Sequence, residues 1–323
     1  MLRRSALALL AVASAGPAFA QAYPTKPINL IVPFSAGGPT DLMARIVGER
    51  MAKELGQQII IDNVTGAAGS IAMGKLAHAA PDGYTIGIGH LGTNVVNGLI
   101  YKNLNYDLLD DLVPIALLPS NPLLVVTSNQ VPAKDLKELV AYLKANADKI
   151  SGGTAGMGSG SHIGVLAFFA ATGTNYQLVP YRGTGPAVQD LIANQIQIMI
   201  DQSSNSLPHV RAGKLKVYAV TAKERTAAAP DIPTTAEAGF PGIEVAIWHG
   251  LWAPKGTPPE IIARLNAAAV AALKDPEIRR KLEDLGQDIP TPEQMQPAAF
   301  DAYQRAEFAK WKPIIEKANV KVE

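Results

Sequence analysis

The chain has 323 residues with 29 basic and 28 acidic side chains, so its formal net charge is only +1. This balance, with no basic cluster, argues against nucleic acid or an anionic membrane surface as a partner. Charged residues make up 18% and hydrophobic residues 48%, which argues against disorder. The chain contains no cysteine, so neither a disulfide nor a cysteine-linked lipid anchor can form. A chain of this length usually folds as two domains.

The first twenty residues have the pattern of a secretory signal peptide. Arg3 and Arg4 form a basic start, residues 6–13 are apolar, and Ala18-Phe19-Ala20 supplies small residues before Gln21. The apolar part is too short to cross a bilayer as a helix. We therefore expect residues 1–20 to be removed near Ala20 and Gln21, and the mature protein to be periplasmic.

The first predicted unit is a strand, a glycine-rich loop and a helix. Residues 28–32 form a short apolar run that predicts a buried strand, and Ser35-Ala36-Gly37-Gly38 predicts a loop that a ligand can approach closely. Thr40 is predicted to cap a helix with an apolar face made of Met43, Ile46, Val47, Met51 and Leu55. Unpaired N–H groups at such a helix start favour a carboxylate or a phosphate. The alternative is that the glycines only let the chain reverse.

Strand-like and helix-like segments alternate along the rest of the chain, which predicts an α/β protein with mostly parallel sheets. Further strands are expected at residues 58–62, 84–89, 123–127, 151–155, 176–181, 195–201, 214–221 and 244–253. The C-terminal third is mainly helical, with helices expected to open at Thr257-Pro258-Pro259-Glu260 and at Thr291-Pro292-Glu293-Gln294. Because these helices have no strands to alternate with, we expect them to return to the first domain.

This return implies two crossings between domains, near residues 121–126 and 245–250. The predicted domains are lobe 1, residues 21–121 with 251–323, and lobe 2, residues 122–250. Two crossings make a hinge that can close over a ligand.

Ligands of open α/β sheets bind outside the carboxyl ends of the strands. Four small, polar loops follow predicted strands, at residues 34–41, 89–94, 156–162 and 182–185. The candidate ligand-binding residues come from these loops and from one later strand end: Phe34, Ser35, Ala36, Gly37, Gly38, Thr40, Asp41, Thr93, Asn94, Gly158, Ser159, Gly160, Ser161, His162, Arg182, Gly183 and Asp201.

Several of these residues have a second interpretation. Ser159 and Ser161 could donate to a ligand, or one of them could simply cap a helix. Asp201 could face the cleft or cap the next helix at Ser203. Arg182 could pair with a carboxylate or stay solvated. Trp248, at the second crossing, could form the floor of the cleft or belong to the core.

Enzyme motifs are weak in this sequence. Gly87-Ile88-Gly89-His90-Leu91-Gly92 matches a dinucleotide fingerprint formally, but it follows the third strand rather than the first. There is no GxSxG elbow and no HExxH spacing. His162 directly follows Ser161 and is better placed to flank a helix start than to act as a base. We expect no catalytic residue, no cofactor and no metal; the alternative is a secreted α/β hydrolase-like enzyme that uses Ser159 or His162.

Six segments together resemble the Bug family of extracytoplasmic solute receptors, the binding components of tripartite tricarboxylate transporters. They are YPTKPINLIVPFSAGGPTD, DNVTGAAG, APDGYTIGIG, PYRGTGPAVQDL, WHGLWAPKGTP and the long C-terminal helix. The resemblance implies a two-lobed type II periplasmic-binding-protein fold that closes on a small carboxylate without catalysis. It points to residues 34–41 and 158–162 as holders of the carboxyl groups, partly through ordered waters.

The resemblance also implies partners. We expect a monomer that binds a dicarboxylate, an aromatic acid or another organic acid and meets the membrane components of a tripartite tricarboxylate transporter. A receptor that presents its ligand to a membrane sensor is an alternative. Asp62-Asn63-Val64-Thr65-Gly66 departs from the family's usual glutamate-asparagine-arginine-proline start, so this loop lacks the family's arginine.

Overall fold

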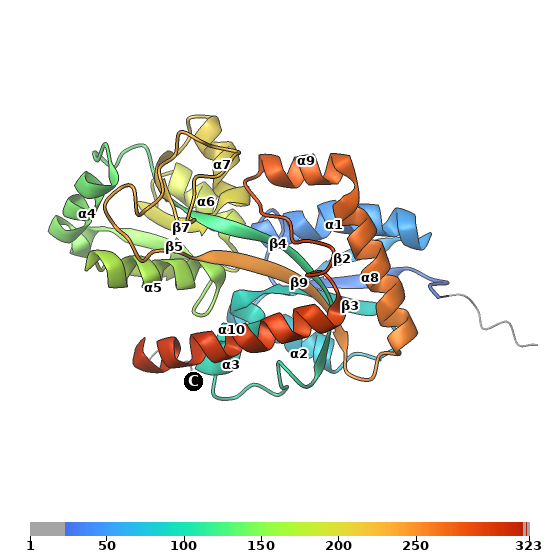
Figure 1. The fold of residues 1–323 in the computed structure, drawn as a ribbon. Coiled ribbons are helices and arrows are strands. Elements are labelled where there is room, and N and C mark those ends of the chain that lie inside the picture. The colour runs from blue at the N-terminus through green and yellow to red at the C-terminus, as the bar shows by residue number, and fades with distance from the viewer. Residues whose placement is uncertain (1–22, 319–320, 322–323) are drawn as a thin grey trace, which may run out of the picture.

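The computed structural model describes residues 23–318 and residue 321, so the predicted signal peptide lies outside the described residues. The fold is α/β and two-lobed, as predicted from the sequence. Two long strands, β4 (Leu112–Thr127) and β9 (Ala246–Pro254), run side by side through the middle of the molecule and connect the lobes (Figure 1). The strands follow the order β2-β1-β3-β9-β4-β7-β5-β6, and β8 also pairs with β4.

Each lobe has a parallel part, as the alternation of strands and helices predicts. In the first lobe β1 (Ile28–Val32) lies parallel to β2 (Ile59–Asn63) and β3 (Thr85–His90). In the second lobe β5 (Ser151–Thr154) lies parallel to β6 (Gln177–Pro180) and β7 (Ile198–Gln202). All pairings of β4 and β9 are antiparallel, which makes the sheets mixed.

Strand β4 belongs to both lobes. It pairs with β9 from Leu112 to Pro122, and from Leu123 onward with β7 and β8 (Lys216–Val220). The sequence predicted only residues 123–127 as a strand, because prolines interrupt the run before it. The structure accommodates them at irregular points, with register shifts against β9 between Pro114 and Ala116 and between Leu118 and Ser120.

The first sheet is covered on both faces because alternate residues of a strand point to opposite sides. Leu30 and Val32 pack with α1 (Pro39–Leu55), α8 (Pro259–Lys274) and α9 (Pro276–Asp284), whereas Ile31 packs in the core with α2 (Ser70–Ala77) and α10 (Pro297–Ala318). A π-helical turn (Gly92–Val96) and α3 (Asn97–Ile100) complete that side. The second lobe carries α4 (Leu136–Ala145), α5 (Gly160–Thr172), α6 (Thr184–Ile192) and α7 (Ser203–Arg211).

The predicted caps of α1 and α8 and the predicted start of α10 were wrong. Helix α1 begins at Pro39 with Gly38 as its N-cap, so Thr40 lies inside the first turn and does not cap it. Helix α8 begins at Pro259, and the Thr257 hydroxyl donates to the Pro254 carbonyl instead of capping the helix. Thr291 and Gln294 do exchange capping hydrogen bonds, but they close a turn ahead of α10. Helix α8 packs against α1, and α10 packs against β4 and the turn Gly92–Val96.

Candidate functional site

The loops at the strand ends of the two lobes meet face to face. The Ser35 N–H donates to the Arg182 carbonyl across this seam, at 3.1 Å. A Cβ on Gly183 would collide with the Ser35 hydroxyl, and a Cβ on Gly185 would lie 3.1 Å from the Gly38 nitrogen. Glycine is needed at these positions because the two backbones approach so closely.

A small cavity lies behind this seam and is lined from both lobes. Its volume is about 10 Å³, room for about one water molecule. The lining residues are Phe34, Pro39, Thr40, His90, Ala155, Ser159, Gly160, Ser161, Thr184 and Gln202. They include the first turns of α1, α5 and α6, so the N-termini of three helices converge on one cavity. The first N–H groups of a helix have no partner within it and carry a partial positive charge, which favours an anion.

Ser159 and Ser161 combine the two roles that the sequence left open. Ser159 is the N-cap of α5 and accepts a hydrogen bond from the His162 N–H at 3.3 Å, and it also lines the cavity. The Ser161 hydroxyl lies 3.1 Å from that of Ser159 and accepts from the Ala155 N–H. His162 Nδ1 accepts from the Gly158 N–H, and burial lowers the His162 pKa to about 4. This histidine thus makes no ring hydrogen bond to either serine in the described structure.

Asp41 shapes the first loop. Its buried carboxylate accepts from the Gly37 N–H at 2.9 Å, from Arg45 Nε at 2.9 Å and from Asn63 Nδ2 at 3.0 Å. Burial alone would raise its pKa, but these hydrogen bonds hold the Asp41 pKa below its usual range. Asn63 also donates to the Phe34 carbonyl, so the segment that lacks the family's arginine supports the loop through an amide.

At the end of β3, a histidine that the sequence analysis did not select faces the cavity. Thr93 and Asn94 were candidates, yet both are fully buried beside the cavity; the Thr93 hydroxyl is bonded to the His90 backbone and to Asn94 Oδ1. His90 itself lines the cavity. The Gly87–Gly92 motif was the sequence signal that could have indicated His90. Gly92 packs against the His90 ring, and a Cβ at this position would lie 2.7 Å from His90 Cε1.

The remaining candidates lie around the cavity without lining it. Ala36, Gly37 and the Arg182 side chain are exposed. Asp201 is fully buried, and its Oδ2 accepts from Asn205 and Ser206 of α7, both at 2.6 Å. Burial raises the Asp201 pKa to about 6. The N-cap of α7 is Gln202, which also lines the cavity. Asp201 therefore binds side chains within α7 and does not cap the helix.

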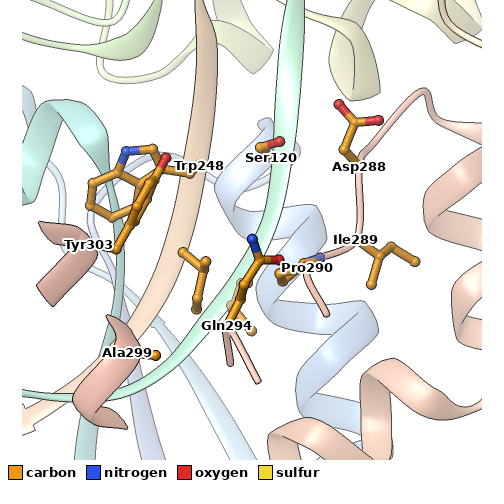
Figure 2. Close-up of a pocket in the computed structure, with 10 residues that line it drawn as sticks. Ser120, Trp248, Asp288, Ile289, Pro290, Gln294, Ala299 and Tyr303 are labelled. Atoms are coloured by element: carbon orange, nitrogen blue, oxygen red, sulfur yellow. The ribbon is translucent and has the colours of Figure 1, made fainter. Parts of the chain in front are cut away.

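A larger cavity of about 410 Å³ lies on the other side of β9 (Figure 2). Trp248 and Tyr303 lie close together on one side of it, with Ser120 and Gln294 across from them. Trp248 packs on α10 and donates to Glu307 Oε2 at 3.2 Å, whereas the next residue, His249, contacts Thr40 on the cleft side. Of the described helices, α10 alone brings its first turn to the larger cavity, through Ala299, whereas first turns from both lobes meet at the smaller one. The smaller cavity is therefore the candidate ligand site.

Residues 43–320 match TctC, the tripartite tricarboxylate transporter family receptor. BugT of Bordetella pertussis is 33% identical over 100% of this chain and 99% of its own length.

Two solved structures from Rhodopseudomonas palustris are similar over nearly their whole length. MatC, solved with bound malate, is 41% identical with a TM-score of 0.87 and covers 91% of this chain and 100% of its own. A second protein, solved with adipate, is 32% identical with a TM-score of 0.87, covering 93% and 99%. The chain therefore belongs to the tripartite tricarboxylate transporter receptor family, which includes the Bug proteins.

Proposed function

We propose that this receptor captures a small carboxylate in the periplasm and delivers it, chemically unchanged, to the membrane components of a tripartite tricarboxylate transporter. Its family is one of substrate-binding receptors, not enzymes. The described residues include no helix that is long and apolar enough to cross a membrane, and no cluster of three or more potential metal-binding side chains.

The convergence of three helix N-termini from both lobes is the observation that carries the proposal. Thr40, Ser159, Ser161 and Thr184 add hydroxyl groups around the same point. None of the described lining residues is Lys or Arg. Neutral donors of this kind match a carboxylate, and contacts to both lobes exist only when the cleft is closed.

The solved relatives support an acid as the ligand. MatC was solved with malate and the second protein with adipate, so related clefts hold dicarboxylates of different length. The cavity of about 10 Å³ has room for only about one water molecule, so the lobes must open around any acid that binds between them.

The first experiment is a thermal-shift screen of small mono- and dicarboxylates, aliphatic and aromatic, followed by calorimetry on variants. Ser159→Ala and Ser161→Ala should each weaken binding by about ten- to a hundredfold, because a hydrogen bond to a charged group contributes about 1.5–3 kcal/mol. Gly38→Val should do worse, since the Gly185 nitrogen already lies 3.6 Å from the Cβ position and the valine methyl groups would extend into the closing seam.

Arg182→Ala is the matched control and should bind almost normally, because the Arg182 side chain is exposed outside the cavity. If Arg182→Ala alone lost affinity, the ligand would depend on that charge and the proposed site would be wrong. Recovery of a chemically altered acid would favour the hydrolase alternative instead. A partner test with purified membrane components separates transport from presentation to a sensor.

Export is tested separately. Mass spectrometry of the exported protein should give an N-terminus at Gln21, since Ala18-Phe19-Ala20 has the small residues that precede a cleavage site. A retained leader would contradict this part of the proposal.

A further inference from the structure

We propose that His90 is a specificity-determining residue of this receptor: its neutral imidazole donates a hydrogen bond from Nε2 to an ionised carboxylate. The inference rests on the proposed function, since it assigns one end of the acid to the wall formed by β3. It adds a binding residue at the end of β3, where the sequence pattern indicated only Thr93 and Asn94.

The tautomer follows from the hydrogen bonds of the other ring nitrogen. His90 Nδ1 accepts from the Gly92 N–H at 2.9 Å and from the Thr93 N–H at 3.3 Å. A nitrogen that accepts two backbone N–H groups carries no proton, so the neutral ring is protonated at Nε2. In the described structure Nε2 has no hydrogen-bond partner of its own, and His90 lines the cavity.

The ring is also fixed in orientation. It stacks on Phe34 with the ring centroids 5.1 Å apart and 13° between the planes, and it meets His249 edge to face at 5.6 Å. Phe34 belongs to the predicted anion loop and His249 to the crossing strand β9. Three segments that are distant in sequence thus hold one donor in place before any ligand arrives, which reduces the ordering cost of binding.

The groups around His90 favour its neutral form. His249 on β9 and His162 on α5 are themselves buried bases, with pKa values lowered to about 4. The Asp41 carboxylate on α1 accepts hydrogen bonds from Arg45 and Asn63. Oδ2 of Asp201 on β7 accepts a hydrogen bond from Asn205 of α7. No described acid is hydrogen-bonded to the His90 ring, and burial lowers its pKa to about 3.

A fixed neutral donor selects ligands in a particular way. It donates to a carboxylate oxygen, and it has no lone pair for an ammonium group or an amide N–H, both of which need an acceptor. The acid should therefore bind as its anion, with no proton taken up by the protein. An imidazolium would instead make binding stronger as the pH falls through its pKa.

The test compares two variants that differ in the donor. His90→Phe keeps a ring that can stack on Phe34 but has no N–H, and His90→Gln places an amide N–H near the position of Nε2. With malate as the calorimetric probe, His90→Phe should lose about ten- to a hundredfold in affinity and His90→Gln should recover most of it. Wild-type affinity should stay constant between about pH 6 and about pH 8, with equal binding heats in buffers of different ionisation enthalpy.

Each other outcome has a definite meaning. Normal malate affinity in folded His90→Phe would overturn the inference and leave carboxylate binding intact. Wild-type affinity that falls about tenfold for each unit of rising pH, with a proton taken up on binding, would do the same. If wild type bound malate more tightly than its monoamide and His90→Phe lost that difference, the preference of the donor for a charged oxygen would be supported directly. If wild type bound no acid of the screen, the proposed function itself would fail.

A measurement on the free protein needs no ligand and no variant. Nitrogen-15 spectra of histidine-labelled receptor near neutral pH should show His90 protonated at Nε2 only. A proton on Nδ1, or on both nitrogens, would overturn the inference even if His90→Phe failed to fold.

Discussion

Three histidines around the cleft are buried as bases, and one carboxyl group is buried as an acid. Burial lowers the pKa of His90 to about 3 and those of His162 and His249 to about 4, from an ordinary value of 6.5. The unfolded chain takes up these protons as the pH falls through about 6.5, whereas the folded chain does not. The stability that they contribute is therefore present above pH 6.5 and is lost as the pH falls toward about 4.

Asp201 acts in the opposite direction. Its pKa is raised by burial from 3.8 to about 6, so the stability linked to it is complete below pH 3.8 and is lost as the pH rises through about 6. Between about pH 4 and about pH 6, the unfolded chain binds three more protons on its histidines, and the folded chain binds one more on Asp201. The unfolded chain therefore holds about two more protons than the folded chain.

We expect the free energy of unfolding to fall by about 2–3 kcal/mol per pH unit between about pH 6 and about pH 5. Urea denaturation at several pH values measures this slope. Asp201→Asn should steepen it by about one proton and His249→Phe should flatten it by about one. An unchanged slope in both variants would mean that these groups do not titrate as their burial implies.

The residues that the sequence predicted best are those whose role is local. Ser159 stands three residues before the His162 N–H that it caps, a relation visible in the sequence alone. His90 could not be found in this way, because Phe34 and His249 fix its ring from distant segments. Thr40 was wrongly predicted to cap α1, because Pro39 takes the first helical position and Gly38 is the N-cap.

Among the elements, α10 is anchored to the sheet by side chains that the sequence pattern does not mark. Gln304, 1% exposed, accepts from Trp252 Nε1 at 3.1 Å and donates to the Asn94 carbonyl at 2.9 Å. Glu307 accepts from the indoles of both Trp248 and Trp311 at 3.2 Å. Glutamine and glutamate are mostly exposed in proteins, so the sequence pattern alone would place Gln304 and Glu307 on the solvent face of the helix.

Gln304→Leu should destabilise the protein by about 2–4 kcal/mol, because it leaves the Trp252 N–H and the Asn94 carbonyl buried without partners. Ala302→Leu, on the exposed side of the same helix, is the control and should change stability by less than about 0.5 kcal/mol. Denaturant titration compares the two; equal effects would show that Gln304 is not an anchor.

Elements with clear periodicity were predicted close to their bounds, and those with mixed signals were missed. Helix α9 escaped prediction because only Ile278 and Leu282 of its nine residues are buried. The first part of β4 was missed because Pro114, Pro119 and Pro122 look like strand breakers, although an antiparallel partner with register shifts tolerates them.

For the whole molecule, the seam between the lobes is built from backbone contacts that only a closed cleft can make. The Ser35 and Arg182 backbones are joined directly, and Gly185 lies against Gly38. A ligand that contacts both lobes shifts the population toward forms in which the cleft closes around it.

We expect small-angle scattering to give a smaller radius of gyration with saturating ligand than without it. Gly38→Val is the control and should show little compaction, because its methyl groups lie in the seam. An unchanged wild-type radius, with binding shown by calorimetry, would mean that the lobes are closed beforehand or that one lobe holds the ligand alone.

The alternation of strands and helices predicted an α/β fold and two crossings, but it could not predict the antiparallel centre. That centre depends on pairings such as Gly87 with Trp252, which join residues far apart in the chain. Periodicity reports how a segment is buried and says little about which distant strand lies beside it.

The sharing of β4 and β9 has a consequence for biogenesis. Residues of the first sheet that leave the ribosome early, such as those of β3, find their antiparallel neighbour only after residue 254 has been made. Pairings between residues so far apart in the sequence form slowly, because the entropy cost of closing the loop comes before the stabilising contacts are made. The nascent chain is therefore expected to remain unstructured until late in synthesis, the state in which a polypeptide can be threaded through a narrow export channel.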